Sequence, residues 1–181
     1  MKLKTLALTL GVAATLCAPL QLSFAADEAG DKMMKPTAAD KAFMKKAADG
    51  GMTEVELGQV AAKNGGSDAV KDFGNDMVKD HTKINDNLKE LAGKMNVTLP
   101  STVSAKHKAM VEKMSGLSGA LFDNAYVPEM VKDHKKDIAE FEKAGQMTKN
   151  DDLKKFINDS LEMMKGHLEK IQKFDQAPKN G

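Results

Sequence analysis

Three of the four histidines in the chain, together with one glutamate, have the types and spacing of a metal site. The pentapeptide Met-Val-Lys-Asp-His occurs twice, ending at His81 and at His134. His167 belongs to a later segment of the chain and Glu54 to an earlier one. Neutral imidazole nitrogen and carboxylate oxygen are ligands for zinc, copper, iron and manganese. These four side chains are therefore the candidate metal ligands.

The pattern of apolar residues places the four candidate ligands on buried helix faces. On each of four segments, apolar residues three and four positions apart form one stripe, which is typical of a helix with a single buried face. His81, His134 and His167 each lie on such a stripe, and Glu54 stands where an apolar residue would be expected. Each is near the middle of its segment, so we expect them to meet at a similar height in the core.

Four polar groups converging in a core require a physical explanation. A buried carboxylate is costly unless it is paired, and a buried imidazole needs partners for both ring nitrogens. Two interpretations stay open. The groups bind one transition metal ion, in a protein for metal handling or stress tolerance. Alternatively, Glu54 pairs with one or more protonated histidines in a hydrogen-bonded core that only fixes the packing of a stress-related structural or interaction module.

The ligand pattern favours one metal ion over a di-iron centre. A ferritin-type di-iron site requires Glu-x-x-His on two helices, with further glutamates from the others. The residues three positions before the inward histidines are Val78, Val131 and Met164. Three histidines and one carboxylate suit a single copper, zinc, iron or manganese ion, and the ligand types do not choose among them.

Methionine adds an argument for copper. Twelve of the 13 methionines follow residue 25, and three of them precede an inward histidine by four positions, on the same helix face. These pairs are Met77–His81, Met130–His134 and Met163–His167. Thioether sulfur is a soft ligand that suits Cu(I), although methionine is also a common core residue.

Three nearby polar residues are expected to stay outside the ligand set. Asp80 and Asp133 precede the repeated histidines and point about 100° away around the helix, so we expect them to support the ligands or to face solvent. His107 is expected to be an exposed surface residue.

The sequence assigns no catalytic residues. It contains no Gly-x-Ser-x-Gly motif and no phosphate-binding glycine loop, and the single cysteine, Cys17, lies in the expected export signal. We therefore expect a binding protein rather than an enzyme. An oxidase acting through the bound metal is a further hypothesis.

The segments that carry the candidate ligands predict an all-α protein. Long helices are expected over residues 37–64, 67–96, 120–144 and 150–175, with a shorter helix over 101–115. The expected N-caps are Thr37, Ser67, Ser101 or Thr102, and Asn150 or Asp151, while Gly65-Gly66 and Gly145 are expected to end helices. Pro128 should kink the third long helix or delay its start to near Tyr126. Four long helices with one short crossover helix predict a four-helix bundle.

The ends of the chain indicate export. Residues 1–25 have the basic start, apolar run and small-residue cleavage site of a signal peptide, so the mature protein is expected in the periplasm without a membrane span. An uncleaved anchor is the weaker alternative. Residues 26–36 are expected to form a flexible linker, 37–176 the bundle, and 177–181 a disordered tail.

The composition limits the classes of partner that we expect. After removal of residues 1–25, 25 basic and 26 acidic residues remain, tryptophan is absent, and there is one tyrosine. This balance gives no reason to expect nucleic-acid binding. The expected partner is a metal ion, and a homodimer stays open.

Several motifs, in one order, resemble a known family. They include Ala-Ala-Asp-Gly-Gly-Met-Thr-Glu-Val-Glu-Leu-Gly (47–58), both Met-Val-Lys-Asp-His copies, Ser-Gly-Ala-Leu-Phe-Asp (118–123), Tyr126 and His167. The chain resembles the exported bacterial domain of unknown function 4142, grouped with ferritin-like folds and often labelled an outer-membrane protein. The resemblance covers residues 38–174 and implies a ferritin-like bundle and a periplasmic location, but no established activity. Glu54, His81, His134 and His167 fall on its motif positions, whereas Pro128 departs from the usual residue.

Overall fold

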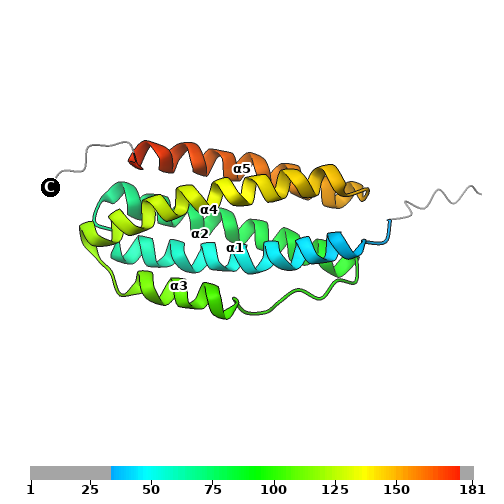
Figure 1. Ribbon diagram of the computed structural model, residues 1–181, viewed down its shortest axis with the longest axis horizontal. Coiled ribbons are helices and arrows are strands. Elements are labelled where there is room, and N and C mark those ends of the chain that lie inside the picture. The colour runs from blue at the N-terminus through cyan, green and yellow to red at the C-terminus, as the bar shows by residue number, and fades with distance from the viewer. Residues whose placement is uncertain (1–33, 176–181) are drawn as a thin grey trace, which may run out of the picture. The chain divides into compact units, whose positions relative to one another are not determined.

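A computed structural model of the protein describes residues 34–175, in which regular structure is helical (Figure 1). The helices are α1 (Ala38–Asn64), α2 (Asp68–Lys94), α3 (Ala105–Ser115), α4 (Gly119–Met147) and α5 (Asp151–Asp175). No strand is present in this part of the chain, so the predicted all-α class is confirmed. The predicted signal peptide, most of the linker and the predicted tail lie outside the described residues.

Side-chain caps begin three of the long helices where the sequence predicted them. Thr37 Oγ1 accepts a hydrogen bond from Asp40 N at 3.1 Å, and Asp40 Oδ2 accepts one from Thr37 N at 2.8 Å, which completes a capping box. Ser67 Oγ accepts from Val70 N at 3.3 Å at the start of α2. Asn150 Oδ1 accepts from Leu153 N at 2.9 Å at the start of α5. These bonds satisfy backbone donors that a helix leaves free in its first turn.

The four long helices form a bundle of two antiparallel hairpins. α1 packs along α2, and α4 packs along α5, because each pair is joined by a short loop. The hairpins meet through α2 with α5 and α1 with α4. The crossover from α2 to α4 contains α3, which lies along the outside of α1 (Figure 1). The predicted four-helix bundle with a short crossover helix is therefore confirmed.

The apolar core is divided into two clusters. One includes Met44, Ile84, Leu88, Phe141 and Leu153, together with their neighbours on α1, α2, α4 and α5. The other is built around Leu57, Phe73, Met77, Tyr126 and Met130. Along every long helix a buried polar residue separates members of the two clusters: Glu54, His81, His134 and His167. The bundle thus carries a polar layer between two apolar ends.

Two helix boundaries differ from the prediction. α3 begins at Ala105 rather than after Ser101 or Thr102, because Ser104 is its N-cap and Ser104 N donates to Asp49 Oδ1 at 2.6 Å. α4 continues past Gly145 to Met147. A Cβ at Gly145 would lie 3.2 Å from Ile157 Cγ2, so this glycine allows close packing on α5 and does not end the helix.

Pro128 neither delays nor ends α4, which runs through it from Gly119. Proline removes one helical hydrogen bond and leaves the carbonyl four residues earlier without a donor. That carbonyl belongs to Asn124, and both Asn124 and Pro128 are exposed, so water can solvate the freed group. The expectation that α4 would start near Tyr126 is wrong.

None of the helices within residues 34–175 combines the length and the apolar character needed to cross a membrane.

Candidate metal centre

The four predicted ligands meet in the polar layer, one from each long helix. Glu54 comes from α1, His81 from α2, His134 from α4 and His167 from α5. Their exposed fractions are 3, 1, 0 and 6%, respectively. The imidazole centroids of His81 and His134 are 5.9 Å apart, those of His81 and His167 are 5.2 Å apart, and those of His134 and His167 are 5.6 Å apart. The bundle therefore brings three imidazoles and one carboxylate together away from bulk solvent.

Each imidazole has one ring nitrogen held by a neighbour. His81 Nδ1 lies 2.9 Å from Glu54 Oε2. His134 Nδ1 donates to the Met130 carbonyl oxygen at 3.0 Å, and His167 Nε2 lies 3.0 Å from Asp80 Oδ2. Since a carbonyl or carboxylate oxygen accepts, these partners place the proton of each neutral ring on the held nitrogen.

The second nitrogen of each ring has no hydrogen-bond partner among the described residues. These atoms are His81 Nε2, His134 Nε2 and His167 Nδ1, and all three are buried. One nitrogen from each histidine lies within 4.8 Å of the other two. A histidine that ligates a metal usually has its other ring nitrogen fixed by an oxygen, as each of these three rings has. The cluster of His81, His134 and His167 can therefore hold a metal ion.

Burial keeps the histidines in the protonation state that metal binding requires. Removal from water lowers the pKa of His81 to about 4, with the carboxylates of Asp137 and Asp80 acting in the opposite direction. Burial also lowers the pKa of His134 and that of His167, against the attraction of Glu54 and Asp80, respectively. The three rings are neutral at pH 7 and can donate lone pairs.

Glu54 lies on the held side of the rings. Its Oε2 contacts His81 Nδ1, and its Oε1 is 3.8 Å from His134 Nδ1. These are the nitrogens opposite to the free ones on both histidines. Burial raises the pKa of Glu54 to about 7, while His134 lowers it and Asp133 raises it further. This position suits an acceptor that orients His81 better than a direct ligand beside the free nitrogens.

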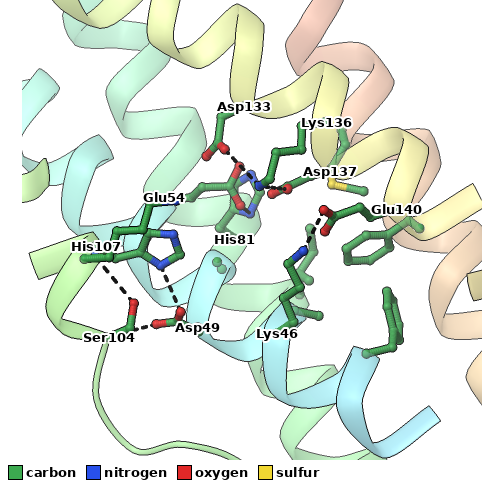
Figure 2. Close-up of a pocket in the computed structure, with 18 residues that line it drawn as sticks. Lys46, Asp49, Glu54, His81, Ser104, His107, Asp133, Lys136, Asp137 and Glu140 are labelled. Atoms are coloured by element: carbon green, nitrogen blue, oxygen red, sulfur yellow. Dashed lines mark hydrogen bonds and ion pairs between the residues drawn. The ribbon is translucent and has the colours of Figure 1, made fainter. Parts of the chain in front are cut away.

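A second group of carboxylates adjoins Glu54. One oxygen from each of Glu54, Asp133 and Asp137 lies within 4.8 Å of the other two. Lys136 Nζ is 3.0 Å from Asp137 Oδ1 and 3.5 Å from Asp133 Oδ1. Burial, reinforced by the charges of Glu54 and Asp133, raises the pKa of Asp137 to about 7. Figure 2 shows these side chains in a pocket of about 260 Å³ that both Glu54 and His81 line.

His107 is not the exposed residue that the sequence predicted. It lines the rim of the same pocket, and its Nδ1 lies 3.0 Å from Asp49 Oδ2 (Figure 2). Its side chain is 21% exposed, because α3 packs on α1 at this point. His107 is therefore partly buried, but it does not belong to the cluster of His81, His134 and His167.

Sequence reasoning found some of the surrounding residues and missed others. Asp80 supports His167, one of the two roles expected for it, and Asp133 belongs to the carboxylate group. Asp137 and Lys136 were missed, although Asp137 is four residues after Asp133 and therefore on the same helix face. Tyr126 was expected only as a motif residue of the resembling family and was given no role in the site. Its buried hydroxyl has no partner among the described residues, and burial raises the pKa of this phenol.

Comparisons with known proteins support the fold and the family. The family model described as "Domain of unknown function (DUF4142)" matches residues 24–174. A search of curated proteins gives no match. A crystal structure of a DUF305 fragment from Deinococcus radiodurans superposes with a TM-score of 0.68 and 11% sequence identity, covering 78% of this chain and 97% of that fragment. At this identity the likeness concerns the helical fold alone.

Proposed function

The chain belongs to the DUF4142 family, a domain of unknown function, and from its site we propose that it binds one transition metal ion, zinc or copper, in the bundle core. The proposed ligands are His81, His134 and His167. Glu54 orients the ring of His81 through Nδ1, and Asp80 orients the ring of His167 through Nε2. The protein would act after export, in the periplasm, where it would hold or buffer the ion.

One observation carries this proposal. Three buried imidazoles each present one nitrogen that no protein group among the described residues reaches, while the other nitrogen is held by an oxygen. Buried polar atoms in folded proteins are nearly always paired. A single cation bound to all three nitrogens would satisfy them together.

The donor set favours zinc or copper. Three neutral imidazoles with one further position resemble the open zinc sites of proteins, and imidazole also suits copper. Met77 and Met130, which precede His81 and His134 by four positions, are buried in the adjoining core, as is Met164. Met163, the methionine predicted to share a helix face with His167, is only partly buried. Thioether sulfur in the same core is a soft donor type, which extends the range to Cu(I). The carboxylates of a di-iron centre are not supplied at the required Glu-x-x-His spacing.

A polar core that only fixes the packing is the competing function. The bonds from His81 to Glu54 and from His167 to Asp80 would serve such a core as well as they serve a metal site. That explanation requires water, rather than a metal ion, to satisfy the three remaining nitrogens. Metal content therefore separates the two functions.

The experiment is elemental analysis of the mature protein, purified from the periplasm without affinity metal. We expect about one equivalent of zinc or copper in the wild type and in His107→Ala, which removes a histidine outside the cluster. We expect the His81→Ala/His134→Ala variant to contain none. Absence of metal from all three proteins, with stable folds by circular dichroism, would leave the histidines as core architecture.

A further inference from the structure

We propose that Glu54, Asp133 and Asp137 form a second cation site, which takes an oxygen-preferring divalent cation such as Mn²⁺ or Ca²⁺. The site lies in the pocket beside the histidine cluster (Figure 2). It differs from the histidine site in its donor atoms and in the class of metal that it selects.

The first support is the geometry of the three carboxylates. They come from two different helices, α1 and α4, and one oxygen of each lies within 4.8 Å of the others. The side chains are 3% exposed at Glu54, 17% at Asp133 and 13% at Asp137. Like charges this close repel one another, and burial strengthens the repulsion because solvent screens it less. A cation between them would replace repulsion with attraction.

The second support is an oxygen without a partner. Glu54 Oε1 is buried and accepts no hydrogen bond from the described residues, whereas Oε2 of the same carboxylate is beside His81. Glu54 also lines the pocket, and one of its oxygens lies within 4.8 Å of an oxygen of Asp133 and of Asp137. One carboxylate can therefore serve the two sites through different oxygens.

Lys136 shows that a positive charge is already attracted to this position. Its ammonium lies between Asp137 and Asp133, yet its side chain is 48% exposed. A flexible lysine that is half in solvent can swing out when a divalent cation arrives. We therefore treat Lys136 as the counter-ion of the cation-free state and as a competitor for the site.

The pocket has room for the water ligands that such a cation retains. Its volume is about 260 Å³. Each water occupies about 30 Å³ in the liquid. Ca²⁺ takes about six to eight oxygen ligands, and carboxylates with water also suit Mn²⁺. Three carboxylates and several waters can complete either coordination shell.

The main test is titration of metal-free protein with Mn²⁺. Binding is measured by calorimetry and by the loss of the EPR signal of the free ion. We expect one site in the wild type that Asp133→Asn/Asp137→Asn weakens by about 100-fold or more, since two of three anionic ligands are lost. The matched control is Glu129→Gln/Glu142→Gln, which removes two negative charges from the same helix outside the pocket. The control should retain wild-type affinity. Equal Mn²⁺ binding by the Asp133→Asn/Asp137→Asn variant would overturn the proposal.

Lys136→Gln provides a second test, in which the expected result is tighter rather than weaker Mn²⁺ binding. Removal of the competing ammonium should tighten Mn²⁺ binding by about tenfold, the size expected for a unit charge near a divalent ion in a partly solvated site. Unchanged or weaker binding would contradict the proposed position of the cation between these carboxylates.

One competition and one variant separate this site from the histidine cluster. Ca²⁺ at millimolar concentration should displace Mn²⁺, because both prefer oxygen. The His81→Ala/His134→Ala variant should keep its Mn²⁺ site, whatever the outcome of the transition-metal experiment. Failure of Ca²⁺ to displace Mn²⁺, or loss of Mn²⁺ binding with the two histidines in a folded variant, would place the ion on nitrogen and overturn the proposal.

Discussion

Glu54 Oε2 lies 2.9 Å from His81 Nδ1, and this contact joins α1 to α2 within the polar layer. Both side chains are buried, so the interaction is little screened by solvent. It holds one nitrogen of the His81 ring and leaves Nε2, which is buried and has no hydrogen-bond partner among the described residues. Glu54 Oε1 has no hydrogen-bond partner among the described residues, and Glu54 also belongs to the carboxylate group, so Glu54 is the residue common to both proposed sites.

Glu54→Gln should weaken zinc binding at the histidine cluster by about 10- to 100-fold, the usual effect of changing a residue that orients a metal ligand. The amide oxygen can still accept from His81 Nδ1, but the negative charge that increases the basicity of the ring is gone. Affinity is measured by competition with a chromophoric chelator. Glu56→Gln, two residues away on α1, should leave the affinity unchanged. Wild-type affinity in Glu54→Gln would mean that Glu54 does not support the ligands.

Asp80→Asn should reduce zinc affinity by about tenfold, because the carboxylate that holds His167 Nε2 at 3.0 Å loses its charge. Asp76→Asn is the matched control. Asp76 is one turn earlier on α2 and pairs with Lys170 of α5. The Asp76→Asn substitution therefore removes the same charge from the same helix interface, at a residue that does not contact a histidine. The same chelator competition measures both variants. If Asp76→Asn weakens zinc binding as much as Asp80→Asn, the effect is one of general charge.

Zinc should raise the melting temperature of metal-free protein, since a ligand bound only by the folded state stabilises it. At a free concentration 100 times the dissociation constant, the gain is about 2.7 kcal/mol. For a domain of this size that corresponds to roughly 5–10 °C. The shift should disappear in His81→Ala/His134→Ala and persist in His107→Ala. Differential scanning calorimetry with and without chelator measures it, and equal melting temperatures for the wild type would contradict a site in the folded core.

Much of the fold could be predicted because its determinants are local. The stripes of apolar residues identified the four long helices, and Thr37, Ser67 and Asn150 cap three of them through hydrogen bonds within their own first turns. The start of α3 could not be predicted in the same way. Several residues before α3 can act as its N-cap. Ser104 is the one that does so, and its backbone N–H also donates to Asp49 on α1, a contact between helices that the local sequence does not reveal.

The sequence predicted which residues of the candidate site lie on buried helix faces, but not how their side chains are oriented. Periodicity identified Glu54 and the three inward histidines, because each interrupts an apolar stripe at mid-helix. It could not tell which ring nitrogen stays free, since this depends on side-chain rotamers and on partners from other helices. It also could not tell that Asp137 would lie beside Glu54, because that contact depends on the rotation of α4 relative to α1.

Two glycines allow α1 and α2 to approach closely enough for the Glu54–His81 contact. Gly58 is one turn after Glu54, and Gly74 is two turns before His81. A Cβ at Gly74 would lie 2.7 Å from both Ala62 N and Gly58 O, which are backbone atoms that cannot rotate away. The helices would have to separate. The spacing between Glu54 and His81 therefore depends on both glycines.

Gly74→Ala should consequently lower the free energy of unfolding by about 1–3 kcal/mol, the usual cost of overpacking a core. It should also weaken zinc binding, because separation of the helices moves Glu54 away from His81. Gly93→Ala is the control on the same helix. Nothing lies within 4 Å of a Cβ there, so the substitution should stabilise the protein by up to about 1 kcal/mol through better helix propensity. Urea unfolding and chelator competition measure the two effects. Destabilisation of Gly74→Ala with unchanged zinc affinity would show that the site tolerates a shift between α1 and α2, and that Glu54 does not set the position of His81.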